Sequence, residues 1–227
     1  MDSILRVGWF LLPGAANTIA IAVASFPLAL VVAVLVTIPR LQRWPVVSPL
    51  LDWYVDFVRT TPLLLHIFFV FYGLPFAGVR LEPVTAGVLT LSLHVGAYQS
   101  EMLRSAYNSV PIRLLEAASV LGMSKWVRLV RVVGPLALRV ALPALANSLI
   151  EIVLNTVVLS VVTIQDIFFR RTMYIYQFYS GRLESLLLVS AFFISICIPA
   201  AWAVRQLERV VALPGDGTRT NTIKTSR

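Results

Sequence analysis

One carboxylate lies within a long apolar stretch of this sequence. Glu151 is the only charged residue between Val140 and Gln165. Asn147, Glu151 and Asn155 recur every four residues, so on a helix they share one face, which Thr156 borders. A charge in mid-membrane costs about 2.5–3.5 kcal/mol on insertion scales, so it should face water or the interior of a helix bundle. There it could bind a cationic group; protonation, or pairing with a neighbouring helix, is the alternative.

Two histidines, His66 and His94, lie in separate apolar stretches. They could contact a bound molecule, although a hydrogen-bonded structural role is the simpler interpretation. The sequence contains no His-Glu-x-x-His and no Gly-x-Ser-x-Gly motif, and its single cysteine, Cys197, is in an apolar stretch. A phosphate-binding Gly-x-x-x-x-Gly-Lys-Ser/Thr loop is also absent. We therefore predict no metal, no catalytic residues and no cofactor in this chain.

The elements that hold these residues are predicted to be membrane helices. Hydrophobic residues make up 58% of the 227 positions and charged residues only 13%. Soluble domains are about half apolar and about a quarter charged, so the excess must face lipid. The net charge of +8 could indicate nucleic-acid binding. Because the basic residues lie between the apolar stretches, a membrane-flanking role fits better and no nucleic acid is expected.

Five stretches are long enough to cross a bilayer, which takes roughly 20 apolar residues. They lie near 15–38, 56–76, 84–104, 141–165 and 185–205. Their length and lack of alternation favour helices over barrel strands. The sequence thus predicts an all-α integral membrane protein with about five transmembrane helices. Residues 14–208 form this domain, 1–13 an external N-terminal segment, and 209–227 a disordered cytoplasmic tail.

The basic residues also predict an orientation. Thirteen Lys and Arg residues fall in the first loop, the long middle loop and the tail, against five on the opposite side, with Arg59 at the mouth of the second helix. Cytoplasmic loops are the ones rich in Lys and Arg. The N-terminus is therefore predicted outside the cell, and the middle loop and C-terminus in the cytoplasm.

The middle loop, residues 109–135, is too polar to cross a membrane and too apolar for a simple linker. Ser109 can cap a first short helix, which Gly122 interrupts. Ser124 can cap a second, which Pro135 would end. We interpret the loop as a bent helix pair that another protein could grip. An amphipathic loop lying among lipid headgroups is the alternative.

The loop also contains an ordered set of residues: Glu116-Ala117-Ala118, then Gly122, Val132 and Pro135. This pattern resembles the EAA loop of type I, binding-protein-dependent ABC importer permeases. Four further motifs resemble the polar amino acid (histidine/glutamine/arginine-type) permease group: Arg59-Thr60-Thr61-Pro62-Leu63-Leu64, Tyr72-Gly73-Leu74-Pro75, Gly96-Ala97-Tyr98 with Glu101 and Arg104, and Leu142-Pro143 with Asn147. The resemblance covers nearly the whole chain. One departure concerns cargo, because Leu154 stands where the group usually has lysine.

The resemblance implies a permease subunit of the bacterial cytoplasmic (inner) membrane. Its partners would be a second permease, identical or related, a dimer of ATPases that binds ATP-Mg, an extracytoplasmic amino-acid-binding protein, and membrane lipid. The helix at Glu116, Ala117 and Ala118, with the bend at Gly122, would dock in a groove of the ATPase. Transport would then proceed by alternating access.

Cargo and alternative functions follow from the same residues. Glu151, together with the absence of lysine at position 154, favours a basic or neutral amino acid. An intramembrane enzyme lacks the motifs named above. A secondary transporter would often show internal repeats, and none is convincing here. A structural subunit of another membrane complex would explain the helices but not the Glu116–Gly122 loop.

Overall fold

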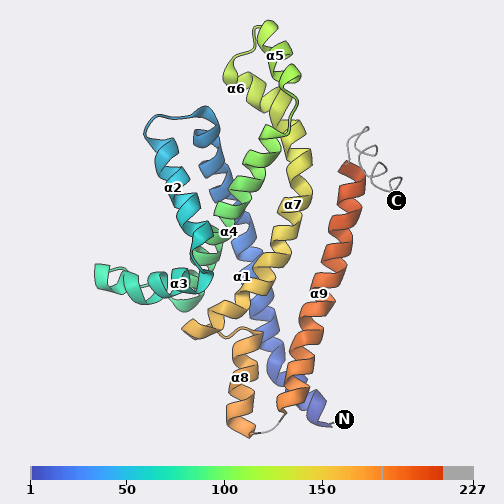
Figure 1. Cartoon of the computed structure of the whole chain (residues 1–227). Helices are drawn as coiled ribbons and strands as arrows, with labels where there is room; N and C mark the ends of the chain where they lie inside the picture. The colour runs from blue at the N-terminus through green and yellow to red at the C-terminus, as the bar shows by residue number, and fades with distance from the viewer. Residues whose placement is uncertain (1, 180, 212–227) are drawn as a thin grey trace, which may run out of the picture.

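The computed structural model describes residues 2–179 and 181–211, and within them the secondary structure is helical (Figure 1). The α-helices are α1 (Asp2–Gln42), α2 (Val47–Thr60), α3 (Leu63–Phe68), α4 (Pro83–Asn108), α5 (Ile112–Val120), α6 (Lys125–Arg128), α7 (Gly134–Asn155), α8 (Ile167–Phe178) and α9 (Arg182–Val211). Two π turns, η1 (Phe69–Gly73) and η3 (Leu129–Val133), and two 3-10 turns, η2 (Leu74–Ala77) and η4 (Thr156–Val162), extend or connect them.

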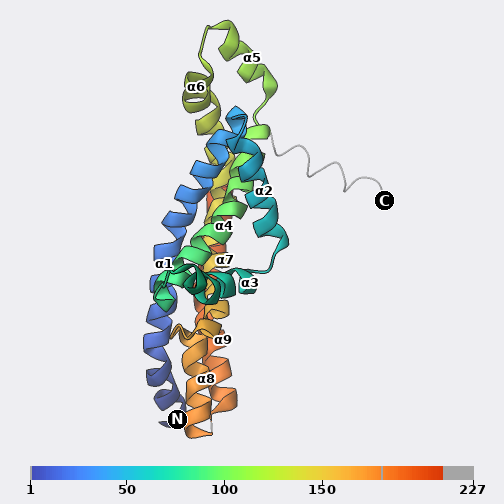
Figure 2. The same cartoon turned by 90° about the vertical axis from the view of Figure 1, so that its left-hand side faces the viewer.

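The long helices α1, α4, α7 and α9 run along one axis (Figures 1 and 2). α4 packs against both α1 and α7 and occupies the centre. The main apolar core lies where these helices meet α3 and η4, and it includes Ile67, Leu91, Val95, Ile152 and Leu159. α5 and α6 project at one end of the molecule, and α8 lies at the other.

Helix α1 is longer than the predicted first span, because it begins at Asp2 and so includes residues 2–13. Near this end it meets the start of α8 at close range. Gly14 allows the approach, since a Cβ there would lie 2.7 Å from the Asp166 carbonyl oxygen. Two hydrogen bonds fix the contact: Asn17 Nδ2 donates to the Gln165 carbonyl at 2.9 Å, and the Ile167 N–H donates to Thr18 Oγ1 at 3.3 Å.

The second predicted span, 56–76, is wrong as one continuous helix. α2 and the helical segment Leu63–Ala77 meet at a bend of 110°. Thr61, between them, has an extended backbone with φ −109° and ψ 136°. A residue before proline is pushed out of the helical region, so Pro62 accounts for the break. α3 consequently runs across the long axis of the molecule.

Among residues 2–179 and 181–211, three helical runs are long and apolar enough to cross a membrane: Ile4–Gln42, Lys125–Val162 and Arg182–Arg209. The bent pair of α2 and α3 would be a fourth. α4 has 26 residues but carries several polar side chains, among them the buried Gln99 and Ser100. Because α4 is enclosed by other helices, these groups need not meet lipid. The third predicted span, 84–104, which corresponds to α4, therefore stays a prediction.

The fourth predicted span, 141–165, belongs to a longer helical run that begins at Lys125. The prediction that Pro135 ends the second short helix is wrong. The Gly134 N–H, directly before Pro135, donates to the Leu129 carbonyl five residues back, and η1 shows the same bond directly before Pro75. A proline ring clashes with the carbonyl four residues back, and the wider π turn relieves that clash.

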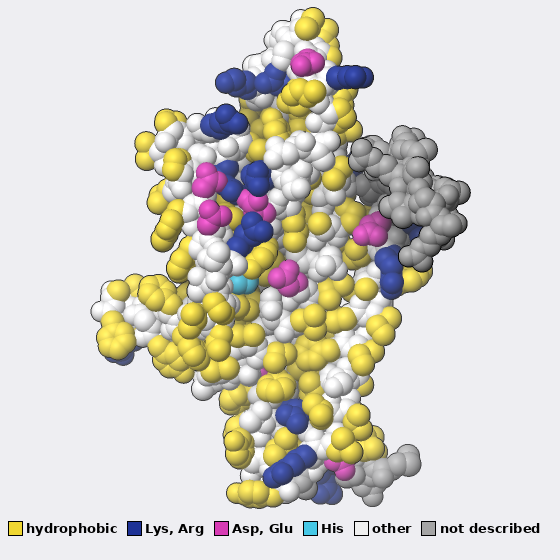
Figure 3. Space-filling model, in the orientation of Figure 1, with side chains coloured by type: hydrophobic (Ala, Val, Ile, Leu, Met, Phe, Trp, Pro, Cys, Tyr) yellow, Lys and Arg dark blue, Asp and Glu magenta, His cyan; other side chains and the backbone are white. Residues whose placement is uncertain are grey.

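The fifth predicted span, 185–205, corresponds to α9, which begins at Arg182 and continues to Val211. The predicted tail begins at residue 209, so its first three residues are helical. The rest of that tail, 212–227, lies outside the described residues. Figure 3 shows a broad hydrophobic band across the middle of one face, with acidic and basic side chains gathered beside α2 and α4 and basic ones near α8.

Candidate functional site

The bend of the middle loop depends on Gly122. We call residues 109–135 the elbow; it projects beyond the other helices (Figures 1 and 2). Gly122 has φ +72°, a left-handed conformation that glycine adopts without strain. Its N–H donates to the Ser119 carbonyl at 3.0 Å, and the Met123 N–H donates to the Ala118 carbonyl at 3.1 Å. These two bonds form a Schellman motif, which ends α5 and turns the chain back.

The predicted coupling residues face different ways at the elbow. Glu116 and Ala117 are exposed. Ala118 is only 3% exposed and packs inward within this chain, and its contact with an ATPase stays a prediction. Val120 and Leu121, in contrast, are 88% and 74% exposed. The outer surface of the elbow is therefore apolar at its tip, which periodicity alone did not reveal.

Capping at the elbow confirms one prediction and corrects another. Ser124 caps α6, because its hydroxyl accepts the Val127 N–H at 3.4 Å. Ser109 does not cap α5, whose N-cap position is Pro111. The Ser109 hydroxyl instead donates to the Ala106 carbonyl at 2.7 Å, one turn back in α4. The prediction failed because serine can bond backward to its own helix as readily as forward.

The two arms of the elbow are bonded to each other. The Arg128 guanidinium of α6 donates to the Ser119 hydroxyl of α5. That hydroxyl in turn donates to the Leu115 carbonyl at 2.8 Å. Since α6 continues through η3 into α7, a partner that moves α5 would also move the helix that carries Glu151.

One face of α7 carries three of the predicted path residues. Asn147 is exposed, and Glu151 and Asn155 are partly exposed. Val140 and Ala144 precede them on the same face and are also exposed. No ion pair or side-chain hydrogen bond involves Glu151 within residues 2–179 and 181–211. This polar face is therefore open to contact from outside the chain.

Thr156 does not belong to that face. The α-helix ends at Asn155, and Thr156 begins the 3-10 turn η4. Its side chain is fully buried, and its hydroxyl donates to the Val153 carbonyl at 2.8 Å. The prediction extended the helical pattern one residue too far, and this bond gives Thr156 a structural role.

A buried side chain beside the polar face of α7 forms a contact that sequence reasoning missed. Gln99 Nε2 on α4 donates to Ser148 Oγ at 2.7 Å, and both side chains are buried. Within a membrane, such a bond holds two helices together because hydrocarbon offers no competing partner. Ser148 directly follows Asn147 and lies about 100° further round the helix, where it is buried against α4.

Charged residues from three helices meet at the elbow end of the bundle. The Arg40 guanidinium of α1 lies 2.6 Å from Asp52 Oδ1 and 2.7 Å from Glu101 Oε1. Arg104 pairs with Glu101 at 2.8 Å, as its spacing predicts, and Arg59 lies 3.8 Å from the same carboxylate. Asp52 is half exposed to solvent and still holds this ion pair. Glu101 thus joins α1, α2 and α4.

The two histidines lie together beside the bend between α2 and α3. His66 Nδ1 and His94 Nδ1 are 3.1 Å apart, so one ring donates and the other accepts. Their rings also pack in series with Phe57 and Tyr98, at centroid distances of 5.2–5.7 Å. Neither bonds to α7 within the described residues. This arrangement favours the structural interpretation over a place on the path.

An all-helical bundle with a projecting elbow and no nucleotide loop is the architecture of an ABC importer's membrane subunit. The chain belongs to the family of binding-protein-dependent transport system inner membrane components, whose profile matches residues 25–212. It is a multi-pass inner-membrane permease, and ATP is hydrolysed by a separate subunit. Membership implies an ATPase and a binding protein as partners.

Several characterised permeases are similar to this chain in sequence. The L-cystine transport system permease of Bacillus subtilis is 33% identical over 74% of this chain and 72% of its own length. The nopaline permease of Agrobacterium fabrum is 36% identical over 69% of each chain. The glutamine permease of Escherichia coli is 30% identical over 88% of this chain and 91% of its own.

Solved structures confirm the fold. A chain of an amino acid ABC transporter crystallised with histidines superposes with a TM-score of 0.86, at 22% identity, over 92% of this chain and 97% of that one. A chain of the methionine ABC transporter in an inward-facing conformation gives 0.75 at 19% identity, over 92% of this chain and 99% of that one.

Proposed function

We propose that this permease moves polar amino acids, with a preference for basic or neutral ones, into the bacterial cell. The similar permeases named for cystine, nopaline and glutamine support an amino acid cargo. An extracytoplasmic binding protein would deliver the amino acid, and a second permease subunit, identical or related, would complete the path. Transport would proceed by alternating access around that path.

The observation that carries this proposal is the open polar face of α7. Asn147, Glu151 and Asn155 are accessible on a helix whose other side is packed against α4 and α9. Lipid does not stabilise a carboxylate at membrane depth, so this face should meet a second permease across a hydrated path. The cationic group of a basic amino acid would find its counter-charge at Glu151.

The elbow supplies the coupling to ATP hydrolysis. Its exposed apolar tip at Val120 and Leu121 is suited to a groove in the ATPase, with Glu116 and Ala117 at the edge of the contact. The ATPase, not this chain, would bind ATP-Mg. Closure of two ATPases would shift the elbow and α7 together, because they share one helical run.

The orientation follows from the distribution of basic residues. The first loop, the long middle loop and the tail together hold 13 of the 19 Lys and Arg residues, so the elbow end of the bundle would face the cytoplasm, and the N-terminus and α8 would face outward. The exposed apolar side chains of α1 and α9, including Leu35 at 65% and Trp202 at 60%, would contact membrane lipid.

Gly122 offers a direct test of the coupling. Gly122→Asp places a charge at the docking surface, and an uncompensated charge in an interface should lower ATP-driven amino acid uptake by about tenfold or more. Gly122→Asn is the matched control, because asparagine has the same shape and tolerates positive φ but is neutral. Uptake would be measured in vesicles with a panel of labelled polar amino acids, after membrane insertion is verified. Normal uptake by the aspartate variant would refute docking at the elbow.

A further inference from the structure

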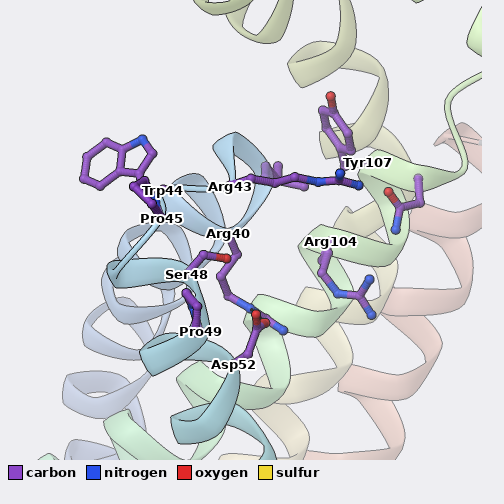
Figure 4. A pocket seen from close by; sticks show the side chains of 11 residues that line it. Arg40, Arg43, Trp44, Pro45, Ser48, Pro49, Asp52, Arg104 and Tyr107 are labelled. Carbon is purple, nitrogen blue, oxygen red and sulfur yellow. Dashed lines mark hydrogen bonds and ion pairs between the residues drawn. The ribbon is translucent and has the colours of Figure 1, made fainter.

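A polar cavity opens where the α1–α2 connection faces the end of α4. Its volume is about 760 Å³ (Figure 4). Three arginines and one aspartate contribute to its lining, together with other hydrogen-bonding side chains: Arg40, Arg43, Arg104, Asp52, Trp44, Ser48, Tyr107 and Asn108. The residues come from two connected helices and from a third that is distant in sequence, so the fold itself creates the site.

The charges in this cavity do not cancel. Arg40 pairs with Asp52 and Glu101, and Arg104 pairs with Glu101. Arg43 has no acidic partner within the described residues. Arg59 also lies 3.8 Å from Glu101, and the Asp56 carboxylate acts on Arg104 through space. Four guanidinium groups thus face three carboxylates, which leaves one positive charge for an anion. Figure 4 shows the Arg43 side chain extending across the opening toward Tyr107.

The backbone at Arg43 holds an unusual conformation. Its φ is +53°, which costs a residue with a side chain about 1–2 kcal/mol relative to the right-handed region. The Arg43 N–H donates to the Arg40 carbonyl at 3.3 Å, so the chain turns immediately after α1. The Trp44 N–H also donates to the Pro39 carbonyl at 3.2 Å, so Arg43 holds the left-handed position of a Schellman motif that ends α1 and sets the direction of its side chain.

An apolar groove adjoins the cavity. Its volume is about 470 Å³, and it runs between α1, α4 and the η3–α7 segment. Leu41 and Tyr107 line both spaces, so the cavity and the groove are neighbours. The groove's other walls are largely aliphatic, with Val34, Ile38, Leu103 and Leu138 among them.

We propose that this pair of spaces binds an anionic phospholipid. The phosphate would lie among Arg43, Arg40 and Arg104, and an acyl chain would lie in the groove. Basic pockets between membrane helices on the cytoplasmic side are suited to anionic headgroups, and each arginine contributes about 1 kcal/mol to the attraction. A free phosphate could bind the arginines, but it would leave the apolar groove unoccupied. Trp44, 46% exposed at the rim, is typical of a membrane boundary.

The inference rests on the proposed orientation, which places this end of the bundle at the anionic cytoplasmic leaflet. It does not depend on which amino acid is carried. Lipid binding is therefore best measured directly, on the detergent-purified transporter with its ATPase, so that a failure of transport would not obscure the result.

Native mass spectrometry would count the lipids retained after incubation with phosphatidylglycerol or phosphatidylcholine. The wild type should retain phosphatidylglycerol in preference. Arg43→Gln should reduce that preference by about fivefold, the loss expected for one arginine. Arg205→Gln is the matched control, because Arg205 is exposed on α9 and lines neither space.

Two further arms identify the ligand. Leu138→Trp should fill the groove and reduce phosphatidylglycerol retention, because Leu138 is 49% exposed and its replacement leaves the core intact. Inorganic phosphate should not displace the lipid. Equal retention by wild type and Arg43→Gln would overturn the proposal. So would unchanged retention by Leu138→Trp combined with displacement by phosphate, which would indicate a free-anion site.

Discussion

Glu151 has no partner of its own among the described residues. It is the only acidic residue of α7, it is partly exposed, and it forms no ion pair there. Buried carboxylates in membrane bundles are usually paired or hydrogen-bonded. In the assembled transporter its partner would therefore come from the cargo or from the second permease.

The two sources predict different behaviour for Glu151→Gln, which keeps the shape and removes the charge. If cargo is the partner, uptake of arginine should fall relative to glutamine by about fivefold, the value of one partly exposed ion pair. Competition between the two labelled amino acids in vesicles measures this ratio. Asn147→Gln, on the same face but neutral in both forms, is the control. An unchanged ratio, or a wild type that prefers acidic amino acids, would contradict a counter-charge role.

At this scale the sequence was informative where a signal is local. The Gly122 bend and the Ser124 cap could be predicted because each depends on neighbouring residues. The inward position of Ala118 could not, because it depends on packing against the rest of the elbow. The Arg40–Asp52 and Gln99–Ser148 contacts were also missed, since they join residues 12 and 49 positions apart.

At the junction between α1 and the start of α8, Gly14 lies very close to the backbone of a segment that is distant in sequence. A Cβ at Gly14 would lie 2.7 Å from the Asp166 carbonyl oxygen and 2.8 Å from Ile167 Cα. Backbone atoms cannot rotate away as a side chain can. Any larger residue at position 14 must therefore separate the two helices.

Gly14→Ala should consequently destabilise the protein by about 1–3 kcal/mol, the usual cost of overpacking. Gly8→Ala, on the same helix, meets nothing within 4 Å and should be neutral or stabilise by about 0.5–1 kcal/mol, because alanine favours helix. Thermal unfolding of both variants in detergent compares them directly. A Gly14→Ala variant as stable as Gly8→Ala would contradict this packing.

At the scale of elements, the apolar stretches predicted the existence of helices better than their shape. The bend before α3 had a local signal in Pro62, but the uninterrupted apolar stretch after it suggested a continuous span. The π turns before Pro75 and Pro135 show the opposite outcome, because the helix widens by one residue at each proline and then continues. Whether a proline breaks or widens a helix depends on the helices packed around it.

The whole molecule has two chemically distinct ends, and their sides of the membrane can be measured. In a Cys197→Ser background, Tyr176→Cys on α8 and Val120→Cys at the elbow each provide one exposed thiol, since the parent side chains are 68% and 88% exposed. A membrane-impermeant maleimide should label the first in intact cells and the second only after the cells are opened. The reverse pattern would overturn the orientation and, with it, the docking of an ATPase at the elbow.

The central position of α4 explains why its polarity did not prevent a correct helix prediction. Composition suggests a poor membrane helix, but α1, α2 and α7 surround it and satisfy many of its polar groups, as the Gln99 and Glu101 contacts show. The sequence could not identify the second permease subunit, because the open face of α7 has the same composition against either an identical or a related partner.

The unbroken run from the elbow into α7 makes this part of the molecule a lever arm. At about 1.5 Å per residue, the part of this run from Lys125 to Asn155 spans about 46 Å. Tilting a rod of that length by about 5° displaces its far end by about 4 Å. A stroke at Val120, carried across the Gly122 bend by the contact between Ser119 and Arg128, would therefore become a displacement of a few ångströms near Asn155.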